Sequence, residues 1–265
     1  MPIHPTAIVD SSADIDSTAE IGAYVIIDGP VSVGAGTRIY PHAYLTGWTE
    51  IGIDCQIHPH TVIGHLPQDR GFGGERSTCR IGDRTVFREG SSVHRGTEPD
   101  SSTVVGSDCY IMANAHVGHN CRVGSHVTMA NGALLSGHVQ LGDRTVLSGN
   151  CGVHQFVRIG ELVMLSGCSQ ITMDVAPFMT ASFRNECTGV NIVGMRRADC
   201  SDEEIDEIKL AYRHLYRRGA GFRSAVEELS RTLHTPCGLR LIEFLQTPSK
   251  RGFCGPPRQR HLERS

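Results

Sequence analysis

Histidine is the residue type whose spacing in this 265-residue chain points most directly to chemistry. His119, His138 and His154 follow one another at similar spacings (138 − 119 = 19 and 154 − 138 = 16), with His116 shortly before the first and Gln155 directly after the last. A neutral imidazole accepts protons near pH 7, and general-base catalysis of this kind accelerates reactions about 10²–10⁴-fold. If the fold stacks these side chains, they form a site that can activate a hydroxyl group for attack.

The element that can stack them is a six-residue repeat from Ile3 to Ile171. Counting in sixes gives (171 − 3)/6 + 1 = 29 positions, of which 26 hold a large apolar residue. The chain's hydrophobic fraction of 39% predicts about 11. The exceptions are Asp69, Glu75 and Pro99. The residue two places before each position is mostly small or β-branched, so each hexad offers one bulky and one small side chain to the same side of a strand.

A strict period of six predicts a mainly β protein with the fold of a parallel β-helix. Three hexads make one three-sided coil, so residues about 18 apart lie above one another at roughly 5 Å. This places His119, His138 and His154 in an approximate column on one edge. Glycine follows the bulky position ten times, as at Gly64 and Gly118, and we interpret these glycines as corners with positive φ.

Two interruptions of the repeat predict loops that leave the coil. We expect the β-helix to span residues 1–180, with excursions at 66–79 and 97–102. The apolar positions continue in the same register after each excursion. A long loop on a rigid scaffold often carries function, so the longer excursion at 66–79 is a candidate for substrate contact.

The segment after the repeat predicts a helical cap. Residues 173–200 show no clear pattern and are expected to be irregular, whereas 201–204 (SDEE) indicate a capping box at the start of a helix. We expect an α-helical C-terminal domain over residues 190–249, because an open coil exposes a strand edge that must be covered. Residues 250–265 are expected to form a flexible tail.

Composition narrows the class of protein further. The formal net charge is −3, so no basic surface predicts nucleic-acid binding. The first ten residues lack the features of a secretory signal, and no stretch approaches the ~18 apolar residues of a membrane span. Half of the ten cysteines occupy the small inward positions, where a free thiol packs as a small hydrophobe. We therefore expect a cytoplasmic protein without stable membrane insertion.

Short motifs in and after the repeat resemble those of the UDP-N-acetylglucosamine O-acyltransferase family. They are QD at 68–69, HRGT at 94–97, NAHVGHNC at 114–121, SGH at 136–138, VHQF at 153–156 and GVNIVG at 189–194. The resemblance covers nearly residues 1–248. It implies a left-handed parallel β-helix of hexapeptide repeats with a C-terminal α-helical cap. It also implies a homotrimer with active sites in the clefts between subunits.

The resemblance further implies the reaction, which is the first step of lipid A biosynthesis. A (3-hydroxy)acyl chain moves from acyl carrier protein to the 3-hydroxyl group of UDP-N-acetylglucosamine. The donor is the thioester on the carrier's own phosphopantetheine, so the enzyme needs no cofactor and no metal. A thioester is already activated, which leaves proton removal and stabilisation of the oxyanion to the protein.

The family's functional positions match particular residues of this chain. His119 matches the general base, and Gly137 matches the residue whose amide faces the oxyanion. The residues implied to bind substrate are Asp69, His94, His116, His138, His154, Gln155, Gly167, Asn191 and Arg197. Among them, Gly167 stands where side-chain size limits acyl length, and Asn191 and Arg197 stand at the nucleotide end.

Three residues depart from the family's pattern. Asn120 stands where the family usually has Asp beside the base, so carboxylate support for an imidazolium is missing there. Gly71 replaces a lysine, and Ala198 replaces an arginine expected on the diphosphate side. The expected catalytic residues are thus retained, while the nucleotide end is altered.

Three other interpretations fit parts of the pattern. Another hexapeptide acyl- or acetyltransferase would use acetyl-CoA and a different nucleotide-sugar or small acceptor. A metal enzyme would hold Zn²⁺ on the stacked histidines, as β-helical carbonic anhydrases do, but zinc needs three ligands converging at about 2.1 Å and a column spaces its rings by a strand separation. A non-catalytic scaffold has no need to combine the loop, the histidines and the cap.

Overall fold

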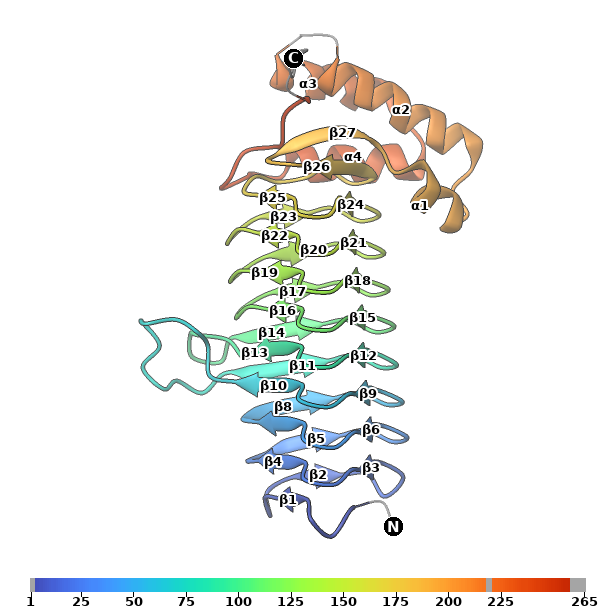
Figure 1. Cartoon of the computed structure of the whole chain (residues 1–265). Coiled ribbons are helices and arrows are strands. Elements are labelled where there is room, and N and C mark those ends of the chain that lie inside the picture. The colour runs from blue at the N-terminus through green and yellow to red at the C-terminus, as the bar shows by residue number, and fades with distance from the viewer. Residues whose placement is uncertain (1–2, 218–220, 258–265) are drawn as a thin grey trace, which may run out of the picture.

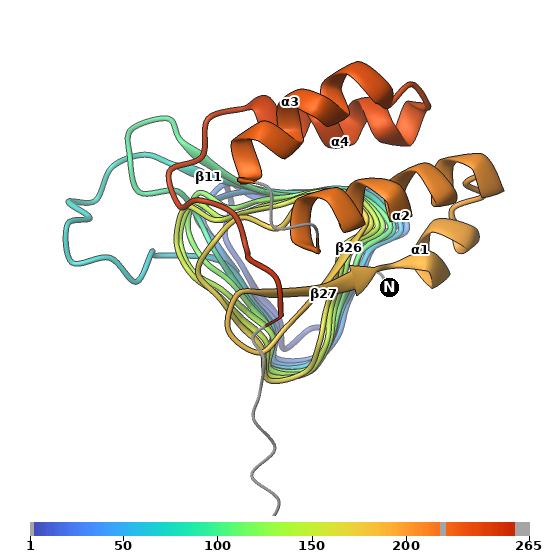
Figure 2. The ribbon, with the colours of Figure 1, turned by 90° about the horizontal axis from the view of Figure 1, so that it is seen from above.

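Three parallel sheets wind into a three-sided coil in the computed structural model of the chain (Figure 1). The structure describes residues 3–217 and 221–257. Seen along its axis the coil is triangular, and its successive turns lie on one another (Figure 2). We name its flat sides face 1, face 2 and face 3, in the order in which the chain visits them in each coil.

Short strands separated by tight turns make up the three faces. Face 1 consists of β1 (Ile8–Val9), β4 (Ile26–Asp28), β7 (Tyr44–Thr46), β10 (Val62–His65), β13 (Ser92–His94), β16 (His116–Val117), β19 (Leu134–Leu135), β22 (Gly152–Val153) and β25 (Gln170–Ile171). Face 2 consists of β2 (Asp14–Ile15), β5 (Val31–Val33), β8 (Trp48–Ile51), β11 (Thr78–Ile81), β14 (Ser102–Val105), β17 (Arg122–Val123), β20 (Gln140–Leu141) and β23 (Arg158–Ile159). Face 3 consists of β3 (Glu20–Ile21), β6 (Arg38–Ile39), β9 (Gln56–Ile57), β12 (Val86–Phe87), β15 (Tyr110–Ile111), β18 (Thr128–Met129), β21 (Val146–Leu147), β24 (Met164–Leu165), β26 (Met179–Ser182) and β27 (Glu186–Val190).

The six-residue period sets both the register and the core. Val117 pairs with Leu135, and Leu135 pairs with Val153, so each regular coil takes three hexads. Every large apolar position of the period from Ile21 to Ile171 is buried, which confirms the inward assignment. Full burial of one such side chain contributes roughly 1.5–3 kcal/mol relative to an exposed one. The column of aliphatic side chains is therefore the main source of stability.

The glycines that follow the bulky positions have a different cause from the predicted one. Of the ten, only Gly64 has a positive φ, at 80°. The others lie where adjacent coils approach closely; a Cβ on Gly118, for example, would lie 2.7 Å from the carbonyl oxygen of Leu135. Positive φ is found instead in the turns, at residues such as Asn114 and Asp108. Asn and Asp adopt this left-handed conformation more readily than most other residues.

Both loop excursions leave the coil at the corner that joins face 1 to face 2. The first connects β10 to β11 and the second connects β13 to β14 (Figures 1 and 2). Ile63 pairs with Val93, five hexads further on, and Val93 pairs with Val117, four hexads further on. Because a regular coil takes three hexads, the first excursion inserts two hexads and the second inserts one. The insertions are whole hexads, so the coil continues in phase.

The end of the coil that follows β25 is covered by the cap. The helices are α1 (Ile192–Arg197), α2 (Asp202–Tyr216), α3 (Phe222–Thr232) and α4 (Pro236–Gln246). The predicted capping box is confirmed, because the Ser201 side chain accepts a hydrogen bond from the Glu204 N–H while the Glu204 carboxylate accepts one from the Ser201 N–H. Among the described residues, none of the helices combines the length and apolar character that crossing a membrane requires.

The expectation that residues 173–200 are irregular is wrong. β26 extends face 3 by pairing in parallel with β24, and β27 returns antiparallel to β26. The short helix α1 then follows. This hairpin lacks the six-residue period because it belongs to no full coil. Its pairing satisfies the backbone groups of a strand edge that the coil would otherwise expose.

The expected flexible tail is also wrong for residues 250–257. Phe253 and Gly255 form parallel bridges with Asp174 and Glu186, and the Cys254 side chain is 1% exposed. The Phe253 ring stacks on Phe222 with ring centroids 5.0 Å apart. The bridges hold the segment against the end of the coil and the ring contact holds it against α3, despite the polar residues around it in the sequence. Residues 258–265 lie outside the described part of the chain.

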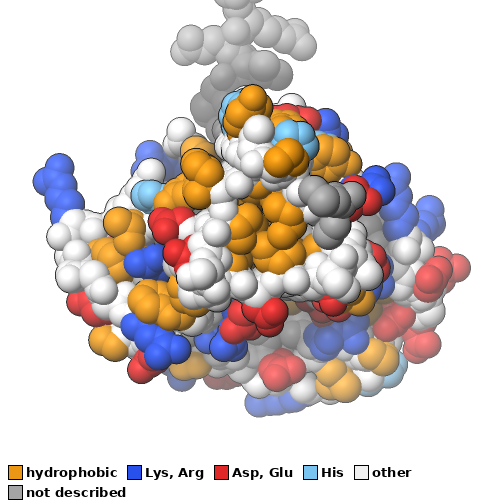
Figure 3. All heavy atoms as spheres, turned by 90° about the horizontal axis from the view of Figure 1, so that it is seen from below, with side chains coloured by type: hydrophobic (Ala, Val, Ile, Leu, Met, Phe, Trp, Pro, Cys, Tyr) orange, Lys and Arg blue, Asp and Glu red, His pale blue; other side chains and the backbone are white. Residues whose placement is uncertain are grey.

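The opposite end of the coil presents its first strands to solvent. Figure 3 looks onto this end and shows apolar side chains gathered near its centre. Ile8 is 65% exposed and Tyr24 is 58% exposed. The core positions Val9 and Ile15 are only partly buried. The aliphatic column therefore reaches full burial only after the first coil.

Candidate active site

One edge of the coil carries both loops and most of the expected site residues. It is formed by the turns that join face 1 to face 2, and we call it the histidine edge. In the coils beyond the loops it comprises residues 118–121, 136–139 and 154–157. The turns are stacked through backbone hydrogen bonds, as from the N–H of His138 to the carbonyl of His119 at 2.9 Å. Side chains from consecutive coils therefore meet along this edge.

The predicted histidine column is correct for two of its three members. The rings of His119 and His138 lie edge to face, with centroids 5.2 Å apart. In the next coil Phe156, rather than His154, stacks on His138 at 4.6 Å. A full coil takes three hexads, whereas His154 follows His138 two positions short of that length. His154 consequently lies directly after β22, on the same edge but out of the stack, where it is exposed.

A cavity of about 580 Å³ opens beside the histidine edge. It is lined by Gln68, Ser92, His94, His116, Gly118, His119, Leu134, Leu135, Ser136, Gly137 and Gln155. The structure thus brings together five predicted site residues from four consecutive coils. Asp69 adjoins this lining, because its carboxylate lies 3.9 Å from Nε2 of His119.

A buried arginine fixes the loop that carries Gln68 and Asp69. Arg95 is 8% exposed, and its guanidinium lies 5.6 Å from the ring centre of Trp48 and 5.8 Å from that of Phe72. Trp48 belongs to β8, whereas Phe72 belongs to the first loop. Cation–π contacts reach about 2 kcal/mol when they are desolvated. The arginine therefore ties the loop to the coil.

The two ring nitrogens of His119 have different surroundings. Nδ1 lies 2.9 Å from Oδ1 of Asn120, and Nε2 lies 3.9 Å from Asp69. Asn120 Oδ1 also accepts a hydrogen bond from the backbone N–H of Thr97 at 3.1 Å, so the amide oxygen rather than the NH₂ group faces the imidazole. An amide oxygen only accepts, which assigns the ring proton to Nδ1. Nε2 is therefore left with a free lone pair.

Gly137 lies directly against this lone pair. A Cβ built on Gly137 would be 2.4 Å from both Nε2 and Cε1 of His119. Only glycine lets the backbone approach the imidazole this closely. Within the described residues, the Gly137 N–H donates no hydrogen bond. A backbone donor and a proton acceptor thus stand side by side in the cavity, as acyl transfer requires.

Two further histidines, His94 and His116, line the cavity and are neutral near pH 7. His94 is 6% exposed, and its ring centroid is 4.8 Å from that of His116. Burial lowers the pKa of His94 to about 4, and the neighbouring imidazoles add to the shift. Burial also lowers the pKa of His116, whose Nδ1 lies 2.9 Å from the Ser92 hydroxyl. Nδ1 of His94 is buried and has no hydrogen-bond partner within the described chain.

His138 is surrounded by three residues that the sequence analysis assigned no role. Phe156 stacks on it, Oε1 of Glu98 lies 3.8 Å from its Nε2, and the Lys250 ammonium lies 5.2 Å from the Phe156 ring centre. Burial lowers the pKa of His138, although the Glu98 carboxylate opposes the shift. Counting one full coil onward from His138 identifies Phe156. Glu98 and Lys250 belong to non-repeating segments whose paths the period does not determine.

Known proteins share this architecture along nearly the whole chain. The family described as Udp N-acetylglucosamine O-acyltransferase, domain 2, matches residues 174–254, and the bacterial transferase hexapeptide repeats match residues 102–137. A protein of Anaeromyxobacter sp. (strain Fw109-5) named acyl-[acyl-carrier-protein]–UDP-N-acetylglucosamine O-acyltransferase is 44% identical over 253 residues, which cover 88% of this chain and 91% of the relative. The protein of the same name from Syntrophobacter fumaroxidans is 44% identical over 255 residues, which cover 95% of this chain and 99% of the relative. The chain belongs to the UDP-N-acetylglucosamine O-acyltransferase family.

Solved structures place this family member in the same fold. UDP-N-acetylglucosamine acyltransferase of Francisella novicida superposes with a TM-score of 0.93 at 32% identity, covering 96% of this chain and 94% of that one. UDP-N-acetylglucosamine O-acyltransferase of Moraxella catarrhalis superposes with a TM-score of 0.92 at 37% identity, covering 96% of this chain and 100% of that one. The fold is the left-handed parallel β-helix, and the protein is an acyltransferase. The expected handedness is confirmed.

Gly167 does not lie on the histidine edge of this acyltransferase. It is exposed in the turn that joins face 3 to face 1, between β24 and β25. A Cβ there would lie 3.5 Å from the carbonyl oxygen of Gly149, which is ordinary contact, so a side chain fits. Its place in the acyl pocket remains a prediction from the family.

Asn191 and Arg197 line a separate cavity of about 700 Å³ between face 3 and α1. The Asn191 side chain is already used within the chain. Its Nδ2 donates to the carbonyl of Leu162 at 2.7 Å, and its Oδ1 accepts from the N–H of Gly194 at 3.0 Å. Asn191 therefore caps α1, a structural role that the sequence analysis did not foresee. His126 and Arg144 also line this cavity and add two basic groups to Arg197.

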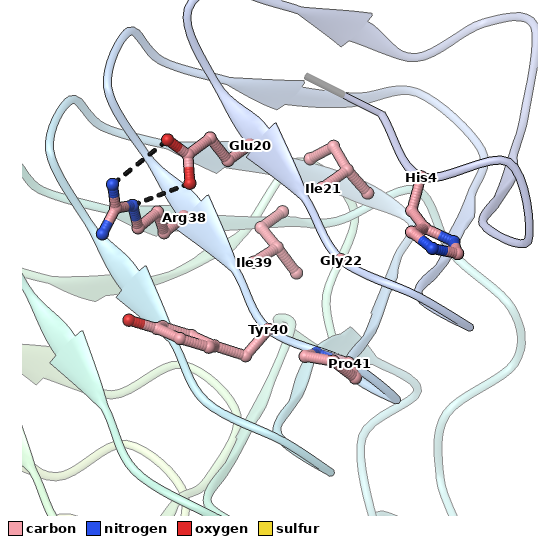
Figure 4. A pocket seen from close by; sticks show the side chains of 8 residues that line it. All are labelled: His4, Glu20, Ile21, Gly22, Arg38, Ile39, Tyr40 and Pro41. Atoms are coloured by element: carbon pink, nitrogen blue, oxygen red, sulfur yellow. Dashed lines mark hydrogen bonds and ion pairs between the residues drawn. The ribbon is translucent and has the colours of Figure 1, made fainter. Parts of the chain in front are cut away.

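Another cavity, of about 560 Å³, lies near the first coils (Figure 4). It is lined by His4, Glu20, Ile21, Gly22, Arg38, Ile39, Tyr40 and Pro41. Its charged groups satisfy each other, since the Arg38 guanidinium lies 2.8 Å from the Glu20 carboxylate. None of the family's site positions lies here. We therefore assign this cavity no part in acyl transfer.

One group of side chains within residues 3–217 and 221–257 has the spacing of metal ligands. The ligand atoms of Cys200, Glu204 and Cys237 all lie within 4.8 Å of one another. This group belongs to the helical cap, and the histidine edge contributes nothing to it. The alternative of zinc held by stacked histidines therefore finds no matching geometry among the described residues.

Proposed function

We propose that this acyltransferase moves a 3-hydroxyacyl chain from acyl carrier protein to the 3-hydroxyl group of UDP-N-acetylglucosamine, with His119 as the general base. The names of its relatives support the donor and the acceptor. The observation that carries the role of His119 is its position, with Nδ1 bonded to Asn120 and Nε2 against the Gly137 backbone. The reaction would be the first step of lipid A biosynthesis.

The chemistry follows from these two neighbours. Nε2 of His119 takes the proton of the sugar hydroxyl while the oxygen attacks the thioester carbonyl carbon. The carbonyl oxygen becomes an oxyanion, which accepts a hydrogen bond from the N–H of Gly137. Collapse of this intermediate forms the ester and breaks the carbon–sulfur bond. The imidazolium then returns its proton to the leaving thiolate, so the base is restored and no cofactor is consumed.

The remaining residues of the edge would position the acceptor. Asp69, Gln155 and the buried pair His94 and His116 supply polar groups around the cavity. Because His94 and His116 are neutral, they can hydrogen-bond sugar hydroxyls without attracting the diphosphate. We assign the diphosphate side to the outer part of the edge, where His154 is exposed and His138 lies below Phe156.

We propose a homotrimer in which neighbouring subunits complete the site. Leu134 lines the cavity and is 49% exposed, so a neighbouring chain would bury it. Gly167, Asn191 and Arg197 lie away from the histidine edge of the same chain, which also favours a site between subunits. Light scattering should give about three times the 28.8 kDa mass of one chain. A fully active monomer would contradict this proposal.

The cytoplasmic location stays a prediction.

The decisive experiment supplies UDP-N-acetylglucosamine and acyl carrier proteins charged with 3-hydroxyacyl chains of graded length. Mass spectrometry of the product should show one added acyl group, and fragmentation should place the ester on the 3-oxygen. Acetyl-CoA serves as the competing donor. Turnover with acetyl-CoA alone would favour another hexapeptide acetyltransferase and overturn the proposal.

The role of His119 is tested by His119→Ala. We expect kcat to fall at least about 100-fold, with an unchanged melting temperature, because the side chain lies at a cavity rather than in the core. The matched control is His60→Asn, which removes an exposed imidazole from another corner and tolerates the positive φ of 62°. Near-normal turnover of the His119 variant would show that another group removes the proton.

A further inference from the structure

The residue next to the proposed base is an amide where a carboxylate is expected, yet a carboxylate stands directly behind it. Nδ2 of Asn120 donates a hydrogen bond to Oε2 of Glu98 at 2.7 Å. Oδ1 of the same amide lies 2.9 Å from Nδ1 of His119. Three groups are therefore linked in a row, from the loop carboxylate through the amide to the imidazole.

We propose that Glu98 supplies, through the Asn120 amide, the negative charge that stabilises the imidazolium of His119 during acyl transfer. Glu98 and Asn120 are positioning residues in this scheme, because neither touches the reacting atoms. The inference rests on the proposed role of His119 as the base. It assigns a function to the 97–102 excursion that the expected loop contacts did not include.

The orientation of the amide is fixed by its neighbours. Oδ1 accepts from the backbone N–H of Thr97 at 3.1 Å, and the Thr97 hydroxyl lies 2.9 Å from it. Rotating the amide would place NH₂ against the Thr97 N–H and an oxygen against the Glu98 carboxylate. Both contacts would be repulsive. The only satisfied arrangement directs the amide oxygen to His119 and the amide NH₂ to Glu98.

Glu98 is suited to carry a full charge at this place. Burial raises its pKa, but hydrogen bonds from Thr97 and Asn120 and the neighbouring His138 outweigh this effect and lower the pKa below its usual value. A hydrogen bond to a carboxylate is roughly twice as strong as one between neutral groups. It polarises the amide, so that Oδ1 becomes a better acceptor for the Nδ1–H of an imidazolium. The Glu98 side chain is 57% exposed, so solvent screening keeps the effect moderate.

The loop is held in place by contacts that do not use the Glu98 carboxylate. The Ser101 hydroxyl accepts from the Glu98 N–H at 3.1 Å and lies 2.7 Å from the Glu98 carbonyl oxygen. The Ser77 hydroxyl donates to the carbonyl of Gly96 at 2.6 Å. Replacing the carboxylate by an amide should therefore leave the loop where it is. The substitution tests charge rather than folding.

The experiment compares Glu98→Gln with a matched control in purified full-length protein. Glu98→Gln should lower kcat about three- to tenfold, the range expected when a charged hydrogen bond becomes a neutral one, with less than a twofold change in KM for UDP-N-acetylglucosamine. Asp100→Asn removes another carboxylate from the same loop. The Asp100 backbone N–H donates to the carbonyl of Arg76, a contact that the substitution keeps, so kcat should be unchanged. Melting temperatures verify that both variants fold.

A second variant distinguishes charge from shape. In Glu98→Gln/Asn120→Asp the hydrogen bond is kept, donor and acceptor are exchanged, and the one negative charge moves next to His119. We expect kcat to return to within about twofold of the wild-type value, because the carboxylate then supports the imidazolium directly. A purely structural role of Glu98 would give no such recovery.

The outcomes separate this inference from the proposed function. If His119→Ala abolishes transfer but Glu98→Gln has wild-type kcat, the inference is overturned and the base assignment stands. Equal losses in Glu98→Gln and in the double variant would also overturn it. If His119→Ala retains activity, the proposed function itself is wrong.

Discussion

Replacing Gly137 by alanine should misplace His119 while leaving the fold intact. A Cβ at this position lies 2.4 Å from Nε2 and Cε1, and ordinary contact begins near 3.4 Å. The imidazole must therefore move by about 1 Å. Displacements of this size cost roughly 100-fold in rate when they affect a reacting group. The backbone N–H at position 137 is retained, so the loss cannot come from a missing oxyanion donor.

The assay is steady-state transfer to UDP-N-acetylglucosamine, combined with thermal unfolding. kcat should fall about 100-fold, whereas stability should change by less than about 1 kcal/mol because the clash is with a movable ring at a cavity. Gly152→Ala is the matched control, since a Cβ at Gly152 meets no atom within 4 Å. It should keep wild-type kcat.

Combining the substitution with His119→Ala tests the cause of the loss. If Gly137→Ala acts by pushing the imidazole aside, it should have little further effect once the imidazole is gone. Two independent losses that multiply would mean that the alanine disturbs something other than the base. Wild-type kcat in Gly137→Ala alone would refute the close approach on which the proposed mechanism depends.

Three other perturbations test the core, the buried histidines and the acyl pocket. Lowering the pH from 7 to 5 should destabilise the fold by about 2 kcal/mol through His94. Burial lowers the pKa of His94 in the folded state to about 4, so between pH 6.5 and pH 4 only the unfolded state binds the proton. The stability present above pH 6.5 is therefore lost as the pH falls towards 4. His94→Gln should therefore flatten the pH dependence of urea unfolding, and equal slopes in both proteins would contradict this. Ile51→Asp buries an unpaired charge in the aliphatic column and should prevent folding, measured by circular dichroism; Ile53→Asp, at a 42% exposed site, should melt like the wild type. Gly167→Met should shift the donor preference towards shorter acyl chains, and an unchanged chain-length profile would remove Gly167 from the acyl pocket.

The six-residue period was sufficient to predict the coil, its core and the phase across both loops. The prediction succeeds because the inward side chains and the strands share the same six-residue period. The period also predicts the contact between His119 and His138. One coil later the prediction is wrong. The residue three hexads after His138 is Phe156, whereas His154 matches by residue type but lies two positions short of a full coil. The glycines after the bulky positions differ from the prediction for a related reason, because close approach between coils is a property of stacking that one strand does not reveal.

Contacts made by non-repeating segments could not be derived from the period. Glu98 meets Asn120 only because the second loop returns along the histidine edge, and the sequence does not determine that path. The Phe253 ring packs against α3 and α4 in a segment whose composition indicates a tail. Asn191 is read as a nucleotide contact until α1 is known, after which its amide is seen to cap that helix.

The limits of what a regular repeat can provide also explain how the site is built. A regular coil offers the same backbone environment at every level, so it can stack imidazoles but cannot give one of them a distinct electrostatic setting. The two excursions break this equivalence at one level. The first brings Asp69 to within 3.9 Å of Nε2 of His119, and the second brings Glu98 to the amide that holds Nδ1. Carboxylates thus approach both ends of one imidazole from outside the coil. Removing either carboxylate should change kcat with little effect on melting, because the chemistry depends on the loops while the stability depends on the column.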